Sequence, residues 1–208
     1  MSVGRTRVVA FHKPLGLVTT HADELGRETV YARLNTMLTP ELRAESWHAI
    51  GRLDLDTTGL LLFTNDGALV HHATQPATKL AKTYRVLAKG LLTPSQLEAL
   101  QDGVELSAGL GQSGPAEAWI EDLRIATTDL GIRITEGKNR QVRRMLLAVG
   151  SQVIRLQRVE FGAIKLDVPE GAWRLLSDDE VARDLGYLPR PLPGATSQRP
   201  RRAARDRR

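Results

Sequence analysis

The stretch 51–67 contains the residues best suited to chemistry. Its sequence is GRLDLDTTGLLLFTNDG, so Asp54 and Asp56 lie just before a continuous apolar run that predicts a buried strand over 59–64. A carboxylate on a loop that a rigid strand holds in place is well positioned to act on a bound ligand. The alternative is that each aspartate only bonds backbone amides within a turn, as loop aspartates often do. Spacing alone leaves both interpretations open for Asp54.

A second candidate site is a cluster of cations in the C-terminal half of the chain. Lys138, Arg140, Arg143 and Arg144 fall within seven residues. Such a cluster attracts acidic partners such as nucleic acid, and it is equally typical of a solvated helix face. Residues 198–208 contain six arginines and one aspartate, so they account for the whole formal net charge of +5. An acidic partner must therefore bind this segment or a local cluster in an otherwise neutral chain.

The elements that position these residues follow from apolar patterning and turn signals. Strands are predicted over 7–11, 59–64, 84–87, 116–120, 131–135 and 152–161, and helices over 93–102, 139–149 and 177–185. The glycine-rich segment 109–114 lacks the Lys-Ser or Lys-Thr of a phosphate-binding loop, so we expect a hairpin turn or loop there. Strands outnumber helices and do not alternate with them, which argues against a doubly wound parallel sheet. We therefore predict an α+β fold with a mixed, mostly antiparallel sheet.

Composition limits the class of protein. With 41% hydrophobic and 25% charged residues the chain is typical of soluble globular proteins, and no apolar run approaches the roughly 20 residues of a membrane helix. The start of the chain has no signal-peptide pattern and the chain has no cysteine, which predicts a cytoplasmic location without disulfides or thiolate metal sites. We expect one catalytic domain over 1–188 and a flexible, basic, Pro/Arg-rich tail over 189–208.

Other polar residues are weaker candidates. His71 and His72 are adjacent on a predicted helix, so they point to different faces and do not chelate one metal well. We expect structural roles for both histidines, and turn or capping roles for Asp56 and Asp66. No metal site is predicted.

Four blocks of the chain together resemble the bacterial ribosomal small- and large-subunit pseudouridine synthases. The blocks are HKPLG at 12–16, GRLD with TGLLL and TNDG within 51–67, KTYRV at 82–86 and EGKNRQVRRM at 136–145. They occur in the family's order and cover the chain from about residue 8 to residue 176. Such a coincidence is very improbable, which favours a chemical role for Asp54 over a turn role.

The resemblance implies a central antiparallel sheet divided into two subdomains that flank an active-site cleft. It also implies the reaction: the N1 glycosidic bond of a uridine in RNA is cleaved, the uracil turns, and C5 joins C1′, without a cofactor. Because the chain begins at the catalytic strand, we expect no N-terminal RNA-binding domain of the ribosomal S4 type. The chain is most similar to the short large-subunit enzymes without that domain. We expect a monomer whose partner is rRNA, specifically 23S rRNA.

Three residues match the family's catalytic positions. Asp54 is the carboxylate that stabilises or attacks the positively charged sugar. Arg143 matches the arginine that keeps this carboxylate ionised and fixes its orientation through paired hydrogen bonds, the alternative being a phosphate contact. Tyr84 offers a ring for the flipped uracil and a hydroxyl for the C5 proton, the alternative being a core tyrosine.

Further residues are expected to bind the RNA substrate. Arg52 fills the gap that the flipped base leaves or contacts a phosphate, and Lys82 contacts a phosphate or braces the site. The remaining predicted contacts come from Lys138, Arg140 and Arg144. The alternative function is a non-catalytic RNA-binding or ribosome-assembly factor on the same fold, which has no chemical reason to retain the three catalytic residues. A hydrolytic nuclease needs paired metal-binding carboxylates or a histidine base, and neither arrangement is evident.

Overall fold

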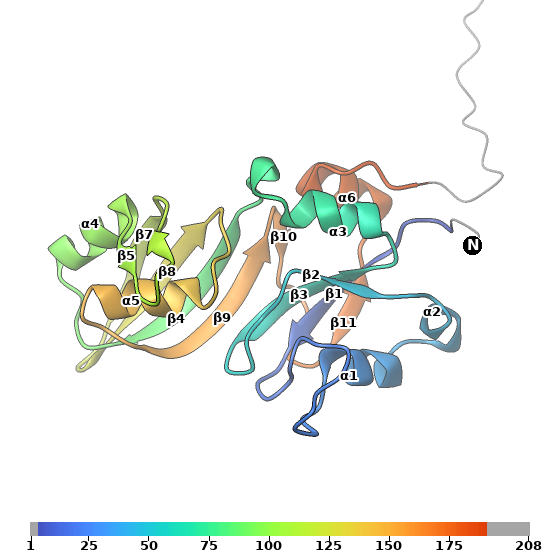
Figure 1. Ribbon diagram of the computed structural model, residues 1–208, viewed down its shortest axis with the longest axis horizontal. Helices are drawn as coiled ribbons and strands as arrows, with labels where there is room; N and C mark the ends of the chain where they lie inside the picture. The colour runs from blue at the N-terminus through green and yellow to red at the C-terminus, as the bar shows by residue number, and fades with distance from the viewer. Residues whose placement is uncertain (1–3, 191–208) are drawn as a thin grey trace, which may run out of the picture.

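In residues 4–190, which are those that the computed structural model describes, nine strands form one sheet that helices flank (Figure 1). The strands of the chain are β1 (Val8–Lys13), β2 (His48–Ile50), β3 (Thr58–Thr64), β4 (Lys82–Lys89), β5 (Glu105–Leu106), β6 (Gly111–Gln112), β7 (Glu117–Leu123), β8 (Thr127–Ile134), β9 (Val153–Phe161), β10 (Ile164–Lys165) and β11 (Trp173–Leu175). The helices are α1 (Val30–Met37), α2 (Pro40–Arg43), α3 (Gly67–Thr74), the 3-10 helix η1 (Pro76–Thr78), α4 (Pro94–Asp102), α5 (Gln141–Ala148) and α6 (Asp178–Leu185).

The sheet consists of two antiparallel halves that meet at a short parallel junction. Its strand order is β11-β1-β3-β9-β4-β8-β7, with β2 paired to β3 and β10 paired to β9. Only β3 and β9 run parallel, and they pair Thr58 with Gln157 and Gly59 with Arg158. At Gly59 the φ angle is +107°, and an added Cβ would lie 2.2 Å from the carbonyl oxygen of Arg158. Glycine therefore allows the two halves to approach closely.

In the half that contains β1 and β3, helices cover both faces of the sheet. Leu60 and Leu62 belong to a core with α3 and α6, while Leu61 and Phe63 belong to a core with α1 and α2. All seven residues of β3 are buried. A strand that is buried on both faces has no solvent-facing positions, which explains the continuous apolar run of the sequence. The loop that precedes β3 is thus attached to a rigid strand.

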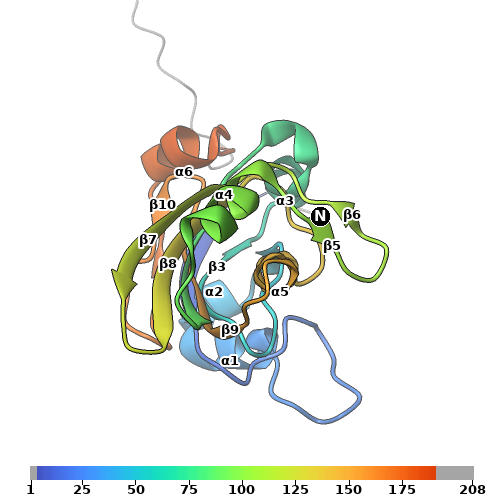
Figure 2. The same ribbon diagram turned by 90° about the vertical axis from the view of Figure 1, so that its left-hand side faces the viewer.

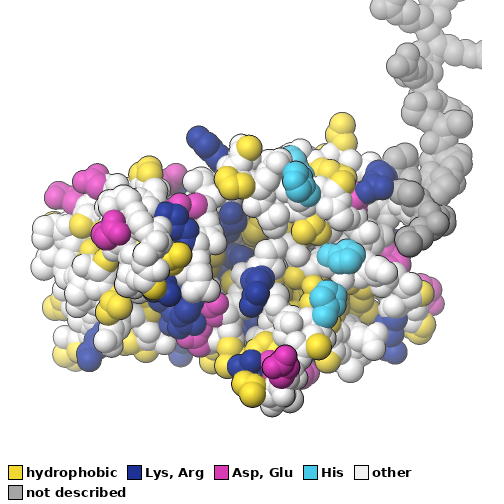
Figure 3. Space-filling model, viewed as in Figure 1, with side chains coloured by type: hydrophobic (Ala, Val, Ile, Leu, Met, Phe, Trp, Pro, Cys, Tyr) yellow, Lys and Arg dark blue, Asp and Glu magenta, His cyan; other side chains and the backbone are white. Residues whose placement is uncertain are grey.

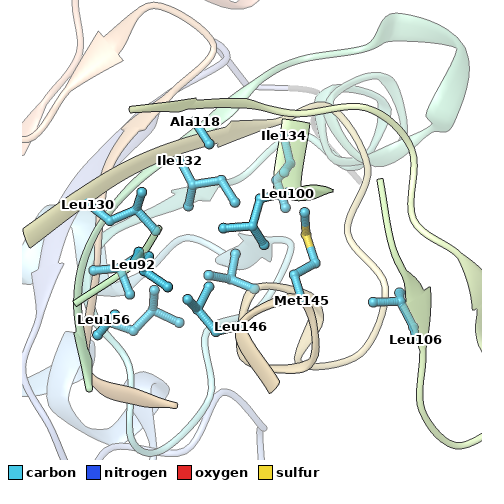
Figure 4. Close-up of a cluster of buried hydrophobic side chains, with 13 residues drawn as sticks. Leu92, Leu100, Leu106, Ala118, Leu130, Ile132, Ile134, Met145, Leu146 and Leu156 are labelled. Carbon is cyan, nitrogen blue, oxygen red and sulfur yellow. The ribbon is translucent and has the colours of Figure 1, made fainter. Parts of the chain in front are cut away.

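In the other half, α4 and α5 lie on the same side of β7 and β8 (Figure 2). Leu100 of α4 and Met145 and Leu146 of α5 share a core with Leu130 and Ile132 of β8 (Figure 4). This packing places the start of α5, with its cluster of cations, near the junction of the two halves.

The predicted α+β fold and most predicted elements are confirmed. The capping box at Thr93 begins α4, and a second capping box at Ser177 begins α6. Helix α5 begins later than predicted, because Arg140 has a left-handed φ of +50° and forms the N-cap. The segment 109–114 belongs to the small hairpin of β5 and β6. Helices α1 and α2 were not predicted, since α2 has only four residues and α1 buries only two side chains.

Asp66 caps α3 as expected, because its side chain accepts a hydrogen bond from the backbone amide of Ala68 at 3.0 Å. The same carboxylate forms an ion pair with Arg190, whose Nε lies 3.0 Å from Asp66 Oδ2. The rest of the predicted tail, residues 191–208, lies outside the described residues. Within the described range, no helix has the length and apolar character needed to cross a membrane.

Candidate active site

A cleft of about 820 Å³ lies where the two halves of the sheet meet. Its walls come from the loop before β3, the end of α3 with η1, the start of β4, the loop before α5, and β9. The space-filling view shows Lys and Arg side chains gathered in this central region (Figure 3). Six of the predicted site residues line the cleft: Arg52, Asp54, Lys82, Tyr84, Lys138 and Arg140. Two others, Arg143 and Arg144, lie on α5 and are not among the lining residues.

The loop that carries Asp54 is held from both sides. Thr19 Oγ1 donates to the carbonyl oxygen of Leu53 at 2.7 Å and accepts from the Leu53 amide at 3.3 Å. The amide of Thr57 donates to the carbonyl oxygen of Asp54 at 3.1 Å, which closes the turn through the main chain. The carboxylate of Asp54 accepts no hydrogen bond from a backbone amide of residues 4–190 and faces the cleft. The main chain thus makes the turn, and the side chain stays available for a ligand.

Lys13, a fully buried lysine at the end of β1, lies next to this loop. Its Nζ donates to the carbonyl oxygens of Thr57 at 2.8 Å and Pro14 at 3.0 Å. Burial lowers the pKa of Lys13 from 10.5 to about 8, while the charges of Asp54 and Asp56 oppose the shift. Sequence reasoning used Lys13 only as part of a motif. His12 and Pro14 flank Lys13, so no local pattern of the sequence indicates that it is buried.

The arginines of α5 bind Asp56 more closely than Asp54. Arg143 Nη2 donates to the carbonyl oxygen of Asp56 at 2.7 Å and lies 3.3 Å from Asp56 Oδ2. Arg140 makes two hydrogen bonds to the Asp56 carboxylate, at 3.1 and 2.8 Å, and its Nη1 lies 3.4 Å from Asp54 Oδ2. Within residues 4–190, Arg143 therefore does not form the expected ion pair with Asp54, because its guanidinium contacts the carbonyl oxygen and the carboxylate of Asp56.

Asp56 consequently has a larger role than the turn or cap that we expected. The hydrogen bonds from Arg140, together with the charges of Arg143 and Arg140, hold the pKa of Asp56 below its ordinary value. Burial lowers the pKa of Arg143, and the charge of Asp56 opposes that shift. The Nε of Arg143 is buried without a hydrogen-bond partner among the described residues.

Strand β4 presents Lys82 and Tyr84 to the cleft, two residues apart on one face of the sheet. Tyr84 is half-buried and packs against the cores of both halves, and its hydroxyl forms no hydrogen bond within residues 4–190. Lys82 Nζ lies 5.5 Å from the centre of the Phe161 ring and donates to the carbonyl oxygen of Thr135 at 3.5 Å. Burial and the charge of Arg158 lower the pKa of Lys82.

The other predicted cations occupy the rim. Arg52 is exposed and forms no ion pair with a described carboxylate. Lys138 Nζ donates to the carbonyl oxygen of Gln112 on the β5–β6 hairpin. Arg144 donates to Ser107 Oγ at 2.8 Å and so supports the same hairpin from outside the cleft. This places Arg144 farther from the centre of the site than we expected.

Sequence reasoning missed Arg158, which lines the cleft from β9 and is 2% exposed. Its Nε donates to the carbonyl oxygen of Leu60 at 2.7 Å, and its guanidinium carbon lies 5.3 Å from the centre of the Phe161 ring. Of the two histidines, His72 has a structural contact, because its Nε2 lies 2.9 Å from the carbonyl oxygen of Leu185, and His71 is exposed. In residues 4–190, no group of three or more His, Cys, Asp or Glu side chains could hold a metal ion.

Comparison with known proteins decides the family. The family of RNA pseudouridylate synthases matches residues 7–148, which include Asp54, Tyr84 and Arg143. The chain belongs to this family. It is 36% identical to ribosomal large subunit pseudouridine synthase B of Pseudomonas aeruginosa over 213 residues, which cover 97% of the chain and 52% of the relative. It is 38% identical to the protein of that name from Escherichia coli K12, covering 88% of the chain and 62% of the relative. The chain thus spans about half to three fifths of these relatives' length.

Solved structures agree with this assignment. A crystal structure of a pseudouridylate synthase superposes with a TM-score of 0.77 at 30% identity, covering 89% of the chain and 76% of the other protein. An H/ACA ribonucleoprotein bound to a substrate RNA containing 2′-deoxyuridine has a TM-score of 0.58 at 16% identity, covering 77% of the chain and 49% of that protein. The second match shows the shared fold alone. The predicted pseudouridine synthase fold is therefore confirmed, and the predicted subgroup of short enzymes stays a prediction.

Proposed function

We propose that this RNA pseudouridylate synthase isomerises a uridine of ribosomal RNA, specifically 23S rRNA, with Asp54 as the catalytic carboxylate. The observation that carries the proposal is the position of Asp54: its carboxylate faces a cationic cleft and is not used by the turn that presents it. The names of the relatives, which are large-subunit enzymes, support rRNA as the substrate class. We expect a monomer that acts in the cytoplasm, where its substrate is made.

The reaction needs no external reactant, because uridine and pseudouridine are isomers. The N1–C1′ bond breaks, the uracil turns and the C5–C1′ bond forms. The proton on C5 then moves to a base, and N1 takes up a proton from solvent, so the atoms balance. Breaking the glycosidic bond creates positive charge on the sugar, and the ionised carboxylate of Asp54 stabilises or attacks that centre. Arg140, whose Nη1 lies 3.4 Å from Asp54 Oδ2, and the more distant Arg143 place positive charge beside this carboxylate.

The walls of the cleft supply binding and orientation. The uracil must leave the RNA stack before its N1 and C5 edges are both accessible. Tyr84 lines the cleft and provides a ring on which the base stacks. Its hydroxyl, which forms no hydrogen bond within residues 4–190, assists proton transfer at C5. Arg52 occupies the gap in the RNA or contacts a neighbouring phosphate, while Lys138 and Arg140 contact the backbone. Arg144 and the basic segment 198–208 add contacts farther from the site.

The test is a map of pseudouridines in 16S and 23S rRNA from cells with and without this gene. We expect one 23S position to lose its pseudouridine in the deletion strain and to regain it with the wild-type gene. Asp54→Asn should not restore it, because the substitution removes the charge with almost no change in shape. Asp122→Asn, at an exposed position on β7, is the matched control and should restore it fully.

Two results would contradict the proposal. If Asp54→Asn restores the modification as well as wild type does, Asp54 is not the catalytic carboxylate. If no rRNA position differs between the strains, and purified protein forms no pseudouridine in rRNA, the protein does not isomerise uridine in rRNA, as the alternative of a non-catalytic factor requires.

A further inference from the structure

Arg158 is a buried cation without a compensating charge. It is 2% exposed, and the only hydrogen bond of its side chain within residues 4–190 goes from Nε to the carbonyl oxygen of Leu60. Its Nη2 is buried without a partner among those residues. Burying an unpaired charged donor is costly, and such groups in folded proteins generally have an acceptor. Arg158 lines the cleft, so the missing acceptor can come from a ligand bound there.

Lys82 provides a second cation that lines the same cleft and lies near the same ring, that of Phe161. Its Nζ lies 5.5 Å from the centre of the Phe161 ring, and the guanidinium carbon of Arg158 lies 5.3 Å from that centre. Neither cation forms an ion pair with a described carboxylate, although the chain forms many such pairs elsewhere. The pKa of Lys82 is lowered by burial and by the neighbouring charge of Arg158. Two neighbouring positive charges in a partly buried wall of a cleft are typical of an anion-binding site.

The fold holds this pair in a fixed place relative to Asp54. Arg158 is paired with Gly59 at the parallel junction of β9 and β3, where a side chain at 59 would collide with the Arg158 main chain. Strand β3 continues the loop that carries Asp54, and Lys82 begins β4 beside β9. The two cations and the carboxylate line one cleft. A single ligand in this cleft can therefore place an anionic group at Lys82 and Arg158 and another group at Asp54.

We propose that Lys82 and Arg158 bind one phosphate group of the substrate, that of the nucleotide whose uracil enters the cleft. The inference rests on the proposed function, and it adds Arg158, which lies beyond the segment 7–148 that the family matches. A phosphate accepts hydrogen bonds from the planar guanidinium and from the ammonium together, and its charge offsets both cations. The contact selects a nucleotide over a free base or nucleoside and positions the sugar carbon relative to Asp54.

The experiment compares the affinity of the full-length protein for uridine 5′-monophosphate, uridine 3′-monophosphate and uridine by titration calorimetry. We expect wild type to bind one of the monophosphates at least about ten-fold more tightly than uridine, as charge-assisted hydrogen bonds imply. Lys82→Met and Arg158→Met should each remove most of this preference and leave uridine affinity unchanged. Arg158→Lys should retain part of it, because the charge remains but the planar geometry is lost.

Matched controls exist on the same strands. Lys89 on β4 and Arg155 on β9 are exposed, and Lys89→Met and Arg155→Met should keep the preference for the monophosphate. Circular dichroism checks the fold of each variant. If Arg158→Met fails to fold, Lys82→Met alone decides, because Lys82 is only partly buried.

Three outcomes would overturn the phosphate site. Wild type could bind the monophosphates no better than uridine; the Lys82 variant could keep the preference as the controls do; or the variants could weaken uridine equally, which would indicate a contact to the base or ribose. The measurement requires no turnover. A protein that passes this test but modifies no rRNA therefore contradicts the proposed function alone, and an active enzyme without the preference contradicts only the phosphate site.

Discussion

Lys13 allows a quantitative test of how the loop before β3 is held. Its side chain is fully buried, and Nζ bonds the carbonyl oxygens of Pro14 and Thr57 at 3.0 and 2.8 Å. Burial lowers its pKa from 10.5 to about 8, although the nearby Asp54 and Asp56 charges favour the protonated form. The folded protein therefore binds this proton less tightly than the unfolded chain does.

This difference makes the free energy of unfolding depend on pH. Below about pH 8 Lys13 is protonated in both states, and the cost of burying its charge is constant. Between about pH 8 and pH 10.5 the unfolded chain keeps a proton that the folded chain has lost, so the free energy of unfolding rises with pH. Each pKa unit corresponds to about 1.4 kcal/mol, so the full rise from this group is about 3 kcal/mol.

The assay is urea unfolding followed by circular dichroism from about pH 7 to pH 10.5, for wild type, Lys13→Met and Lys89→Met. Methionine keeps the unbranched shape and cannot titrate, so the free energy of wild type minus that of Lys13→Met should grow with pH by about 3 kcal/mol. The exposed Lys89 is the control, and its variant should follow wild type. Lys13→Met also leaves two carbonyl oxygens unpaired, which lowers the free energy of unfolding by a constant amount at every pH. The measured quantity is therefore the change with pH of the difference between wild type and Lys13→Met. Parallel curves for wild type and Lys13→Met would refute the reasoning.

Tyr84→Phe should slow single-turnover pseudouridine formation about 10²–10⁴-fold with little change in RNA affinity, because only the hydroxyl is lost. Tyr84→Leu should also weaken RNA binding by about 1–3 kcal/mol, and a Phe variant as fast as wild type would limit Tyr84 to stacking. Gly59→Ala should lower the free energy of unfolding by more than about 3 kcal/mol, because its Cβ would lie 2.2 Å from a carbonyl oxygen at a φ of +107°. Urea unfolding measures this loss. The control is Gly67→Ala, whose Cβ meets nothing within 4 Å, and its free energy of unfolding should not fall in this way. Deleting residues 198–208 should weaken RNA binding more at low salt than at high salt without changing the chosen uridine, and equal affinities of both forms at every salt concentration would exclude an RNA contact.

The position of Asp54 could be predicted from sequence because it depends on local signals. The apolar run 59–64 predicts a buried strand, and the residues before it must then form a loop at the strand's end. Tyr84 and Lys82 were found through the block KTYRV of the family resemblance. The strand predicted over 84–87 begins earlier, at Lys82, so alternation along β4 places both residues on one face. These features need only neighbours along the chain.

The ion-pair partners could not be predicted in this way. Asp56 and Arg140 are separated by 84 positions, and their pairing depends on how two loops from different halves of the sheet meet. Arg158 was missed for a related reason: a charged residue within a strand suggests a solvent-facing position. Arg158 is instead buried at the junction where β9 meets β3 at Gly59, and this pairing of strands from distant parts of the chain leaves no local pattern in β9.

The pairing of Asp56 explains how a carboxylate can stay reactive among arginines. Arg140 makes two hydrogen bonds to Asp56, whereas its Nη1 only lies 3.4 Å from Asp54 Oδ2. The side chains of Arg140 and Asp54 are 41% and 35% exposed, so the ion pair between these two residues contributes little stability. Under the proposed mechanism, positive charge develops on the sugar next to Asp54. A carboxylate without a tight ion pair can stabilise that charge without first breaking one, so its interaction is strongest in the transition state. Asp56 thus keeps Arg140 and Arg143 near enough to attract RNA while it leaves Asp54 free for the sugar.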